Sequence, residues 1–255
     1  VDFSVERDGE RPAVRYALGA IKNVGEAAMA GVIADRAENG PFASLGDFAG
    51  RGDPQAINRR TVENLACAGA FDRLEPNRRR VFDAAEMIAR SAASSAENRA
   101  AGQGGLFEAV ETSGPALPLG DAPDWTAEER LAQENAAVGF YLSAHPLDAY
   151  APVLKRLKAI RWRDLPAALK AGGGARVGRD GGARVKIAGV MTSKRARISQ
   201  HGNRFAFAQF SDQSGQFEAT LFSETLNACR ELLESGKPVV LTCSAQQEED
   251  SSRLV

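Results

Sequence analysis

The chain has 255 residues, of which 44% are hydrophobic and 25% are charged, a composition typical of a folded soluble protein with one to three domains. No apolar run approaches the roughly 20 residues that a membrane span needs, so no membrane partner is expected. The chain lacks a secretory signal pattern and begins with valine rather than methionine, which suggests a fragment. Three scattered cysteines and two isolated histidines argue against disulfides and against a metal site, and favour a reducing cytoplasm.

The charge is distributed very unevenly along the chain, although the net charge is only −1. Residues 151–210 carry 14 Lys and Arg against two Asp and Glu. A local excess of this size is the electrostatic footprint expected for a polyanion partner. The alternative is a basic face that meets only water.

The first fifty residues predict a hairpin followed by helices. Apolar and polar side chains alternate through residues 1–18 on both sides of an Asp-Gly turn at position 8, which predicts two strands. Apolar residues at helical spacing predict a helix over 26–39, ended by the Gly-Pro pair that follows. Ser44 is the expected N-cap of a second, short helix.

The next segment repeats a helix, a tight turn and a helix. Asn58 and Asn77 are the expected N-caps, and Gly69 the turn between the two helices. Residues 93–124 are rich in Ala, Ser, Gly and Pro and are predicted to be a linker.

A capping-box pattern, Thr126 with Glu129, opens a helix to about residue 138, and shorter helices follow up to a glycine-rich connection at 171–182. The remaining segments are β-rich: strands are predicted at 185–198, 204–212, 216–222 and 239–245, with a helix at 224–234. Three strands, a helix and a fourth strand is the order of an oligonucleotide-binding (OB) barrel. Its fifth strand is expected to be missing beyond a beginning at 252–255.

The turn before the first helix is a candidate phosphate site. It reads Ile21, Lys22, Asn23, Val24 and Gly25. Unpaired amides and a partial positive charge at a helix N-terminus favour an anion, and Lys22 adds a cation. Asn23 occupies a position at which a helix-hairpin-helix unit usually has glycine, and Asn is the residue next best able to adopt left-handed dihedrals. An ordinary loop-to-helix junction is the alternative.

Arginines open two later helices, where they oppose the helix dipole. Arg59 and Arg60 follow the Asn58 cap, and three arginines at 78–80 follow the cap at Asn77. An external anion would offset this unfavourable placement. A solvated basic helix end remains the alternative.

The segment 204–212 alternates aromatic and small residues. If alanines fill the barrel, Phe205 and Phe207 are exposed platforms on which bases can stack. Nearby cations would then contact the backbone of a single strand: Lys194, Arg195, Arg197 and Arg204. The opposite orientation, with both phenylalanines in the core, stays open.

No catalytic cluster emerges from the sequence. There is no Ser/His/Asp set, no glycine-rich phosphate loop with its Lys-Ser/Thr ending, and no convergent carboxylates for a metal. We therefore expect no catalytic residue, metal ligand or cofactor in this segment.

Several of these stretches together resemble one family, the alpha (polymerizing) subunit of bacterial DNA polymerase III, a C-family replicative polymerase. They are Leu-Gly-Ala-Ile-Lys-Asn-Val-Gly at 18–25, Asn-Arg-Arg-Thr-Val-Glu at 58–63, Ala-Gly-Ala-Phe-Asp at 68–72, and the segments 134–146 and 204–222. The resemblance runs in order through essentially the whole chain. His145 lies within it but matches no catalytic role in the family, and we interpret it as structural.

The resemblance implies a multidomain α+β architecture. The expected parts are the end of a fingers region (1–18), a tandem helix-hairpin-helix DNA-binding domain (19–92), a linker (93–124), a helical spacer with the glycine-rich connection (125–182) and a truncated OB-fold (183–255). The family's linker carries a sliding-clamp-binding peptide, Gln-x-x-hydrophobic-Phe, which Gln103, Leu106 and Phe107 match. The family's catalytic aspartates and their Mg²⁺ belong to a palm domain outside this segment.

The resemblance implies a role in processive DNA synthesis within the cytoplasm. The hairpins would hold duplex DNA through its phosphates, the barrel would bind single-stranded DNA, and the clamp peptide would raise the effective concentration of the beta sliding clamp. Other polymerase III holoenzyme subunits are further expected partners. A lesion-tolerant paralogue, a tRNA anticodon-binding OB module and a pure interaction scaffold are the alternatives.

Overall fold

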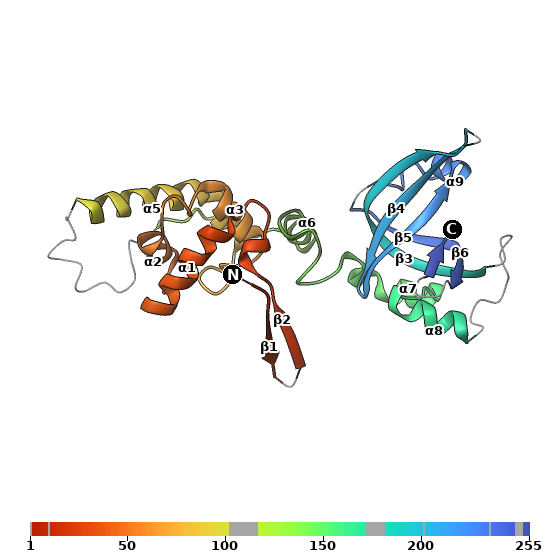
Figure 1. Ribbon diagram of the computed structural model, residues 1–255, viewed down its shortest axis with the longest axis horizontal. Helices are drawn as coiled ribbons and strands as arrows, with labels where there is room; N and C mark the ends of the chain where they lie inside the picture. The colour runs from red at the N-terminus through yellow and green to blue at the C-terminus, as the bar shows by residue number, and fades with distance from the viewer. Residues whose placement is uncertain are drawn as a thin grey trace. The chain divides into compact units, whose positions relative to one another are not determined.

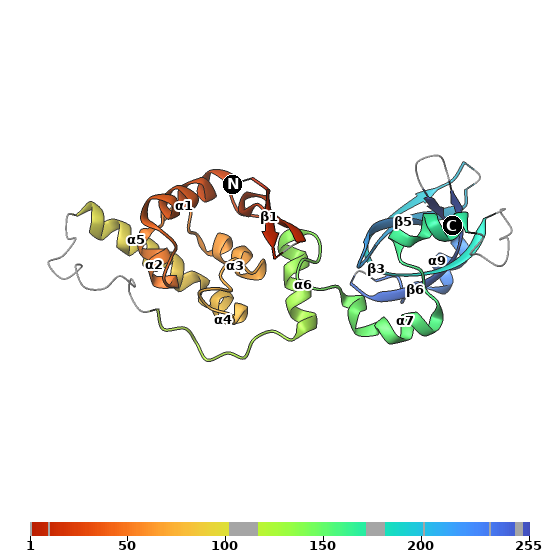
Figure 2. The ribbon, with the colours of Figure 1, turned by 90° about the horizontal axis from the view of Figure 1, so that it is seen from below.

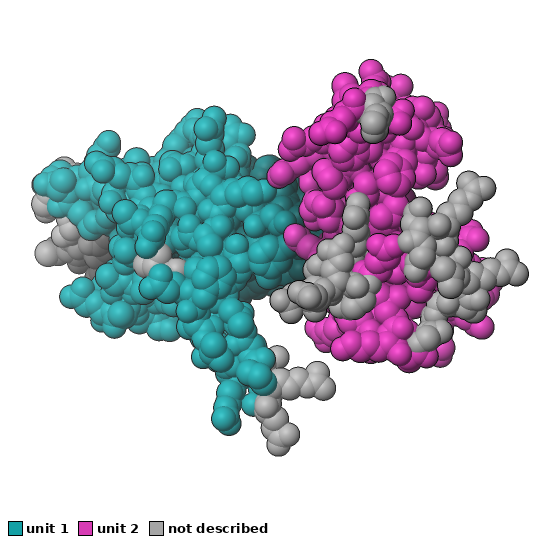
Figure 3. All heavy atoms as spheres, turned by 45° about the vertical axis from the view of Figure 1, so that its right-hand side comes forward, with its two compact units in different colours: residues 1–142 teal, residues 143–255 magenta. Residues whose placement is uncertain are grey.

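The computed structural model divides into two compact units, residues 1–142 and 143–255, which are coloured separately in Figure 3. It describes residues 2–9, 11–101, 117–171, 182–200, 202–234, 236–247 and 252–255. The elements of each unit are labelled in Figure 1.

Unit 1 begins with the predicted hairpin. Strands β1 (Ser4–Asp8) and β2 (Arg11–Arg15) pair antiparallel, from Ser4 opposite Arg15 to Asp8 opposite Arg11. A short 3-10 turn, η1 (Leu18–Ala20), leads from it into the helices.

Helices make up the rest of unit 1 as the structure describes it: α1 (Glu26–Asn39), α2 (Leu45–Arg51), α3 (Arg59–Cys67), α4 (Arg78–Asp83), α5 (Ala85–Ala100) and α6 (Ala127–Val138). The expected caps are confirmed, since the side chains of Ser44, Asn58, Asn77 and Thr126 each accept a hydrogen bond from the third residue of their helix. Each such cap contributes about 1 kcal/mol to helix stability. The sequence therefore determines where these four helices begin.

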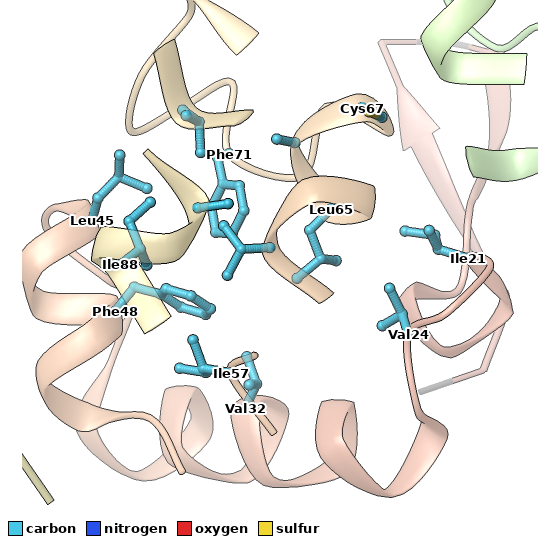
Figure 4. Close-up of a cluster of buried hydrophobic side chains, with 14 of the residues drawn as sticks. Ile21, Val24, Val32, Leu45, Phe48, Ile57, Leu65, Cys67, Phe71 and Ile88 are labelled. Atoms are coloured by element: carbon cyan, nitrogen blue, oxygen red, sulfur yellow. The ribbon is translucent and has the colours of Figure 1, made fainter. Parts of the chain in front are cut away.

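The helices enclose one apolar core, shown in Figure 4. Val32 of α1, Phe48 of α2, Leu65 of α3 and Ile88 of α5 are all buried there. Phe71, from the turn after α3, meets Phe48 edge to face with ring centroids 5.1 Å apart. Burial of each side chain of this size stabilises the fold by about 1.5–3 kcal/mol, so this core holds both helix pairs as one body.

The predicted linker is wrong at both of its ends. Helix α5 continues to Ala100, well into the predicted linker. Alanine has the highest helix propensity, so an alanine-rich segment can form a helix although its composition is also typical of a linker. The guanidinium of Arg99 donates to the carbonyl of Gly50 at the end of α2, which fastens the last turn of α5. At the other end, residues 117–126 lie on unit 1: Asn77 Nδ2 donates to the Ala122 carbonyl over 2.8 Å, and Arg80 Nε to the Gly120 carbonyl over 2.7 Å.

The predicted helical spacer also does not form one part. Ala137 and Val138 of α6 belong to the core of unit 1, whereas the chain from Ser143 onward belongs to unit 2. In unit 2, the short helices η2 (Pro146–Tyr150), α7 (Ala151–Leu157), η3 (Trp162–Asp164) and α8 (Leu165–Lys170) precede the barrel. Figure 1 shows α7 and α8 across one end of it, and Leu165 of α8 is fully buried in the barrel core.

Unit 2 is a closed five-stranded barrel, which confirms the OB-fold. Its strands are β3 (Ala183–Ile198), β4 (Arg204–Asp212), β5 (Gly215–Phe222), β6 (Pro238–Gln247) and β7 (Ser252–Leu254), with α9 (Ser223–Ala228) between β5 and β6. The order around the barrel is β3-β4-β5-β7-β6. Strand β3 pairs with β6 before Val190 and with β4 after it. Gly189, next to this point, allows the close approach of Phe210, because an added Cβ would lie 2.8 Å from Cβ of Phe210.

The expected beginning of a fifth strand at 252–255 is present. The three residues of β7 pair antiparallel with β6 and parallel with β5, where Leu254 lies opposite Ala219. Leu254 is buried in the barrel core. A strand this short closes the barrel because one inward-facing leucine reaches both neighbours.

Candidate nucleic-acid interfaces

The turn before α1 has the backbone expected of a hairpin. Asn23 has φ of +58°, in the left-handed region, as the sequence predicted. Ile21 and Val24 are buried in the core of unit 1, and the Val24 amide donates to the Ile21 carbonyl over 3.1 Å. Figure 4 shows both side chains on the inner side of the turn. The turn is therefore rigidly held from within, with its polar backbone outward.

The N-terminus of α1 is open. Its N-cap residue, Gly25, has no side chain to accept a hydrogen bond, and no hydrogen bond among the described residues uses the amides of Gly25, Glu26 or Ala27. Gly25 has φ of −73°, which any residue can adopt, and its nearest neighbour to an added Cβ is Ala28 at 3.7 Å. These unpaired amides and the helix dipole suit a phosphate oxygen.

Lys22 has a structural partner that the sequence did not reveal. Its amide donates to the Ala137 carbonyl over 3.0 Å and its Nζ to the Ala136 carbonyl over 2.9 Å. Both carbonyls lie at the C-terminus of α6, where a cation is favoured by the helix dipole. Lys22 thus joins the turn before α1 to α6 while its side chain stays exposed.

The second predicted phosphate site is partly satisfied within the chain. Asn58 already caps α3, and the Arg59 guanidinium lies 2.7 Å from the Glu63 carboxylate, one turn along the helix. Both Arg59 and Arg60 are exposed. Arg60 makes no side-chain hydrogen bond or ion pair among the described residues, so it is the more available cation of the two.

Two of the three arginines that open α4, Arg78 and Arg80, have partners within the chain and need no external anion, contrary to expectation. The Arg78 guanidinium is buried and binds both oxygens of Asp72 at 2.8 Å, the Cys67 carbonyl at 3.1 Å and the Glu134 carboxylate at 3.3 Å. Arg80 pairs with Glu75 at 3.3 Å. Their function is to connect α4 with the turn after α3 and with α6.

The barrel resolves the orientation of the aromatic strand. Ala206, Ala208 and Phe210 are completely buried, so Phe205 and Phe207 lie on the outer face, where they are half-buried. Their rings meet edge to face, with centroids 5.4 Å apart. Outward-facing aromatic side chains on an OB strand are the usual stacking platform for unpaired bases.

The strand register shows which cations accompany these rings. Arg197 of β3 lies opposite Phe205, and Arg195 opposite Phe207, so the four side chains share one outer face. On the other side of β4, Phe222 of β5 lies opposite Phe205 and is 52% exposed. Sequence reasoning missed Phe222, although its place at the end of an alternating strand next to a helix was a signal that could have found it.

Two other predicted cations point elsewhere. Lys194 lies opposite Ala208 and Arg204 opposite Ile198, so both belong to the opposite side of the β3–β4 ribbon. Lys194 Nζ donates to the Leu233 carbonyl over 3.3 Å. The prediction that all four cations flank the phenylalanines therefore holds for Arg195 and Arg197 only.

Two groups of predicted residues remain, the clamp-binding peptide and His145. Gln103, Leu106 and Phe107 lie outside the described residues. His145 is buried and caps η2, since its Nδ1 accepts from the Leu147 amide over 3.2 Å and its Nε2 lies 3.2 Å from Ser211 Oγ. Burial lowers the pKa of His145, although the nearby carboxylates of Asp148 and Asp212 oppose that shift.

The part of the chain that the structure describes holds no group of three or more His, Cys, Asp or Glu side chains placed to bind a metal ion. Within the same residues, no helix has the length and apolar character needed to cross a membrane.

Comparison with known proteins agrees with both units. Residues 1–81 match the family described as helix-hairpin-helix motif, and residues 185–251 match the family described as OB-fold nucleic acid binding domain. Proteins named DNA polymerase III subunit alpha match along nearly the whole chain: 38% identity to that of Caulobacter vibrioides over 99% of this chain, and 29% to that of Escherichia coli K12, also over 99%.

Along nearly its whole length, the chain is similar to one part of the DNA polymerase III alpha subunits. The relative from Neisseria meningitidis serogroup B, at 34% identity over 92% of the chain, agrees. The chain spans about a fifth of the length of these relatives, 19–21% of each. Matches in order to both the hairpin and the barrel parts of one DNA polymerase III alpha subunit disfavour the tRNA anticodon-binding alternative.

Proposed function

We propose that this chain is the DNA-holding part of a replicative, DNA-directed DNA polymerase, with one site for duplex and one for single-stranded DNA. The observation that carries the proposal is the outer barrel face, where Phe205, Phe207 and Phe222 lie beside Arg195 and Arg197. Stacking on aromatic rings and phosphate contacts to arginine bind a strand without reading its sequence. A polymerase that copies any template needs this kind of contact.

Duplex DNA is assigned to unit 1. The open amides at Gly25 accept one phosphate, and Arg60, with Arg59, contacts the backbone nearby. Contacts of this type give affinity and position but no base specificity. In the proposed polymerase they hold the product duplex while synthesis continues.

The peptide at Gln103, Leu106 and Phe107 is proposed to bind the sliding clamp. Its support is the match of Gln-x-x-Leu-Phe to the family's peptide in the expected register. Leu106 and Phe107 would fill an apolar pocket and Gln103 would hydrogen-bond at its rim. Other holoenzyme subunits remain expected partners of the whole polymerase.

A substitution at Gly25 separates a phosphate site from a plain helix junction. Gly25→Asp supplies a side-chain cap, which stabilises α1 by only about a few tenths of a kcal/mol relative to glycine and occupies its open amides. We expect an equal or slightly higher melting temperature together with weaker duplex binding in a fluorescence anisotropy titration. Gly31→Asp is the matched control, since Gly31 lies in the same helix with open space around it. Equal binding by Gly25→Asp and Gly31→Asp would exclude the turn before α1 as a phosphate site.

The barrel site has its own test. Phe205→Ala/Phe207→Ala should weaken binding of a single-stranded oligodeoxythymidylate by about 1–3 kcal/mol per lost stacking contact and leave duplex binding unchanged. Unchanged single-strand binding would mean that the barrel serves another purpose, such as contact with a protein subunit.

A further inference from the structure

A second basic surface of unit 2 lies away from the aromatic face. Between residues 155 and 186 the structure describes eight exposed cations, and none of them forms an ion pair among the described residues. The only described carboxylate in that stretch is Asp164. Crowded like charges repel one another, so an unpaired set of this size indicates a polyanionic counterpart.

The centre of this surface is the basic turn, residues 158–163, whose cations are Lys158, Arg161 and Arg163. The Ile160 amide donates to the Lys186 carbonyl over 2.8 Å, and Ile160 bridges to Ile187 of β3. Ile187 points into the core, so the alternation of side chains places Lys186 and Arg161 on the outside.

The basic turn is held firmly to the barrel. Trp162 stacks on Phe217 with centroids 5.5 Å apart, and its amide donates to the Asp212 carboxylate over 2.6 Å. The Arg163 amide donates to Ser214 Oγ over 3.0 Å. Asp212 and Ser214 belong to the β4–β5 turn, so Arg161 and Arg163 extend from a backbone fixed on either side of the partly buried ring of Trp162.

The same β4–β5 turn is the far end of the aromatic face. From Phe207 to Asp212, β4 covers five residues, or about 17 Å. The outer face between them carries Gln209, paired with Glu218 at 2.6 Å, and then Ser211, which is buried against His145. A strand that stacks on Phe205 and Phe207, follows β4 and passes beside η2 at Ser211 would reach Arg163 at the end of the barrel that α7 and α8 cover (Figure 1).

We propose that the basic turn, with Lys186, is a second phosphate-binding site for the same single strand that the aromatic face binds. The proposal rests on the proposed function of the barrel. It extends the single-strand site from the β3–β4–β5 face onto residues that precede the barrel, and it assigns a role to the charge excess at 151–210.

The test uses the full chain and labelled oligodeoxythymidylates of about five and about twelve nucleotides, within the site sizes of OB-folds. Arg161→Gln/Arg163→Gln is compared with wild type and with Lys155→Gln/Lys170→Gln, which removes the same charge from α7 and α8. For the longer strand, we expect the slope of log K against log salt to become shallower by about 1.4, because two single-strand phosphate contacts are lost. The shorter strand should bind as before.

Three results would overturn the proposal: an unchanged slope for the longer strand, an equal loss for both lengths, or an equal loss in the control variant. Phe205→Ala/Phe207→Ala distinguishes this failure from failure of the barrel site itself. If that variant loses single-strand binding while Arg161→Gln/Arg163→Gln does not, only the basic turn is excluded. If the aromatic variant binds like wild type, the proposed function of the barrel fails first.

Discussion

The buried ion pair between Arg78 and Glu134 should be the most sensitive polar contact of unit 1. The Arg78 side chain is 7% exposed and the Glu134 side chain 1% exposed, with 3.3 Å between Nη1 and Oε2. The pair joins α4 to α6, and α6 in turn holds Lys22 of the first hairpin. Loss of the pair therefore weakens the support of the turn whose open amides are the proposed phosphate site.

Arg78→Met removes the guanidinium and keeps an unbranched side chain of similar reach. It leaves the Glu134 carboxylate buried without this cation, at a cost of about 3–5 kcal/mol. For a unit of this size that corresponds to a fall in Tm of roughly 10 °C. Glu134→Gln should cost less, about 1–3 kcal/mol, because Arg78 keeps both hydrogen bonds to Asp72.

The assay is urea unfolding followed by circular dichroism, on the two single variants and the double variant. The double variant should cost clearly less than the sum of the two singles, because the neutral amide that Glu134→Gln introduces needs no cation. Strict additivity, or a cost below about 1 kcal/mol for Arg78→Met, would refute the reasoning that the carboxylate depends on this partner.

Three further predictions concern single residues. Asn23→Val should cost about 1–2 kcal/mol in urea unfolding, whereas Asn23→Gly should be nearly neutral, since the position is left-handed; equal effects would contradict that conformation. The free energy of unfolding of unit 2 should fall as pH drops below about 6.5, because the unfolded chain binds a proton on His145 more readily than the folded one does, and His145→Gln should remove this slope. Burial raises the pKa of the Cys67 and Cys243 thiols to about 11, so at pH 8 a thiol reagent should titrate Cys229 alone until the protein is unfolded; three fast thiols in the folded protein would contradict this.

Local chemistry made much of the fold predictable. Ser44, Asn58, Asn77 and Thr126 mark helix starts because each offers a side-chain oxygen to a free amide, and the structure confirms all four. Alternation likewise predicted the barrel strands, since an inner and an outer face require it.

Composition was a poorer guide where the same composition is typical of two kinds of structure. The alanine-rich residues before Ala100 suit a helix and a linker equally, and the long-range contacts of α5, such as that of Arg99 with α2, favour the helix. Hydrogen-bond partners that lie far apart in the sequence could not be predicted either. Nothing near Lys22 in the sequence reveals that its cation meets the end of α6, and nothing near Arg78 reveals Glu134.

At the candidate sites, residue types were predictable but their faces were not. Phe205 and Phe207 looked equally suited to the core and to the surface, until Ala206, Ala208 and Phe210 filled the barrel. Lys194 and Arg195 are neighbours and therefore lie on opposite faces of β3. Which of the two shares the face of the phenylalanines depends on the strand register, and the bulge in β3 between Met191 and Ser193 sets that register.

The contacts that Arg99 and residues 117–126 make with the rest of unit 1 also bear on how the segment between them can vary during evolution. Ala101 and Leu117, the described residues on either side of positions 102–116, both belong to unit 1, so the fifteen residues between them connect two points of one body. The entropy of closing such a segment changes slowly with length, by about 0.6 kcal/mol for each doubling. A partner-binding peptide can thus be gained, lost or replaced here during evolution while the core and the hairpin of unit 1 stay intact.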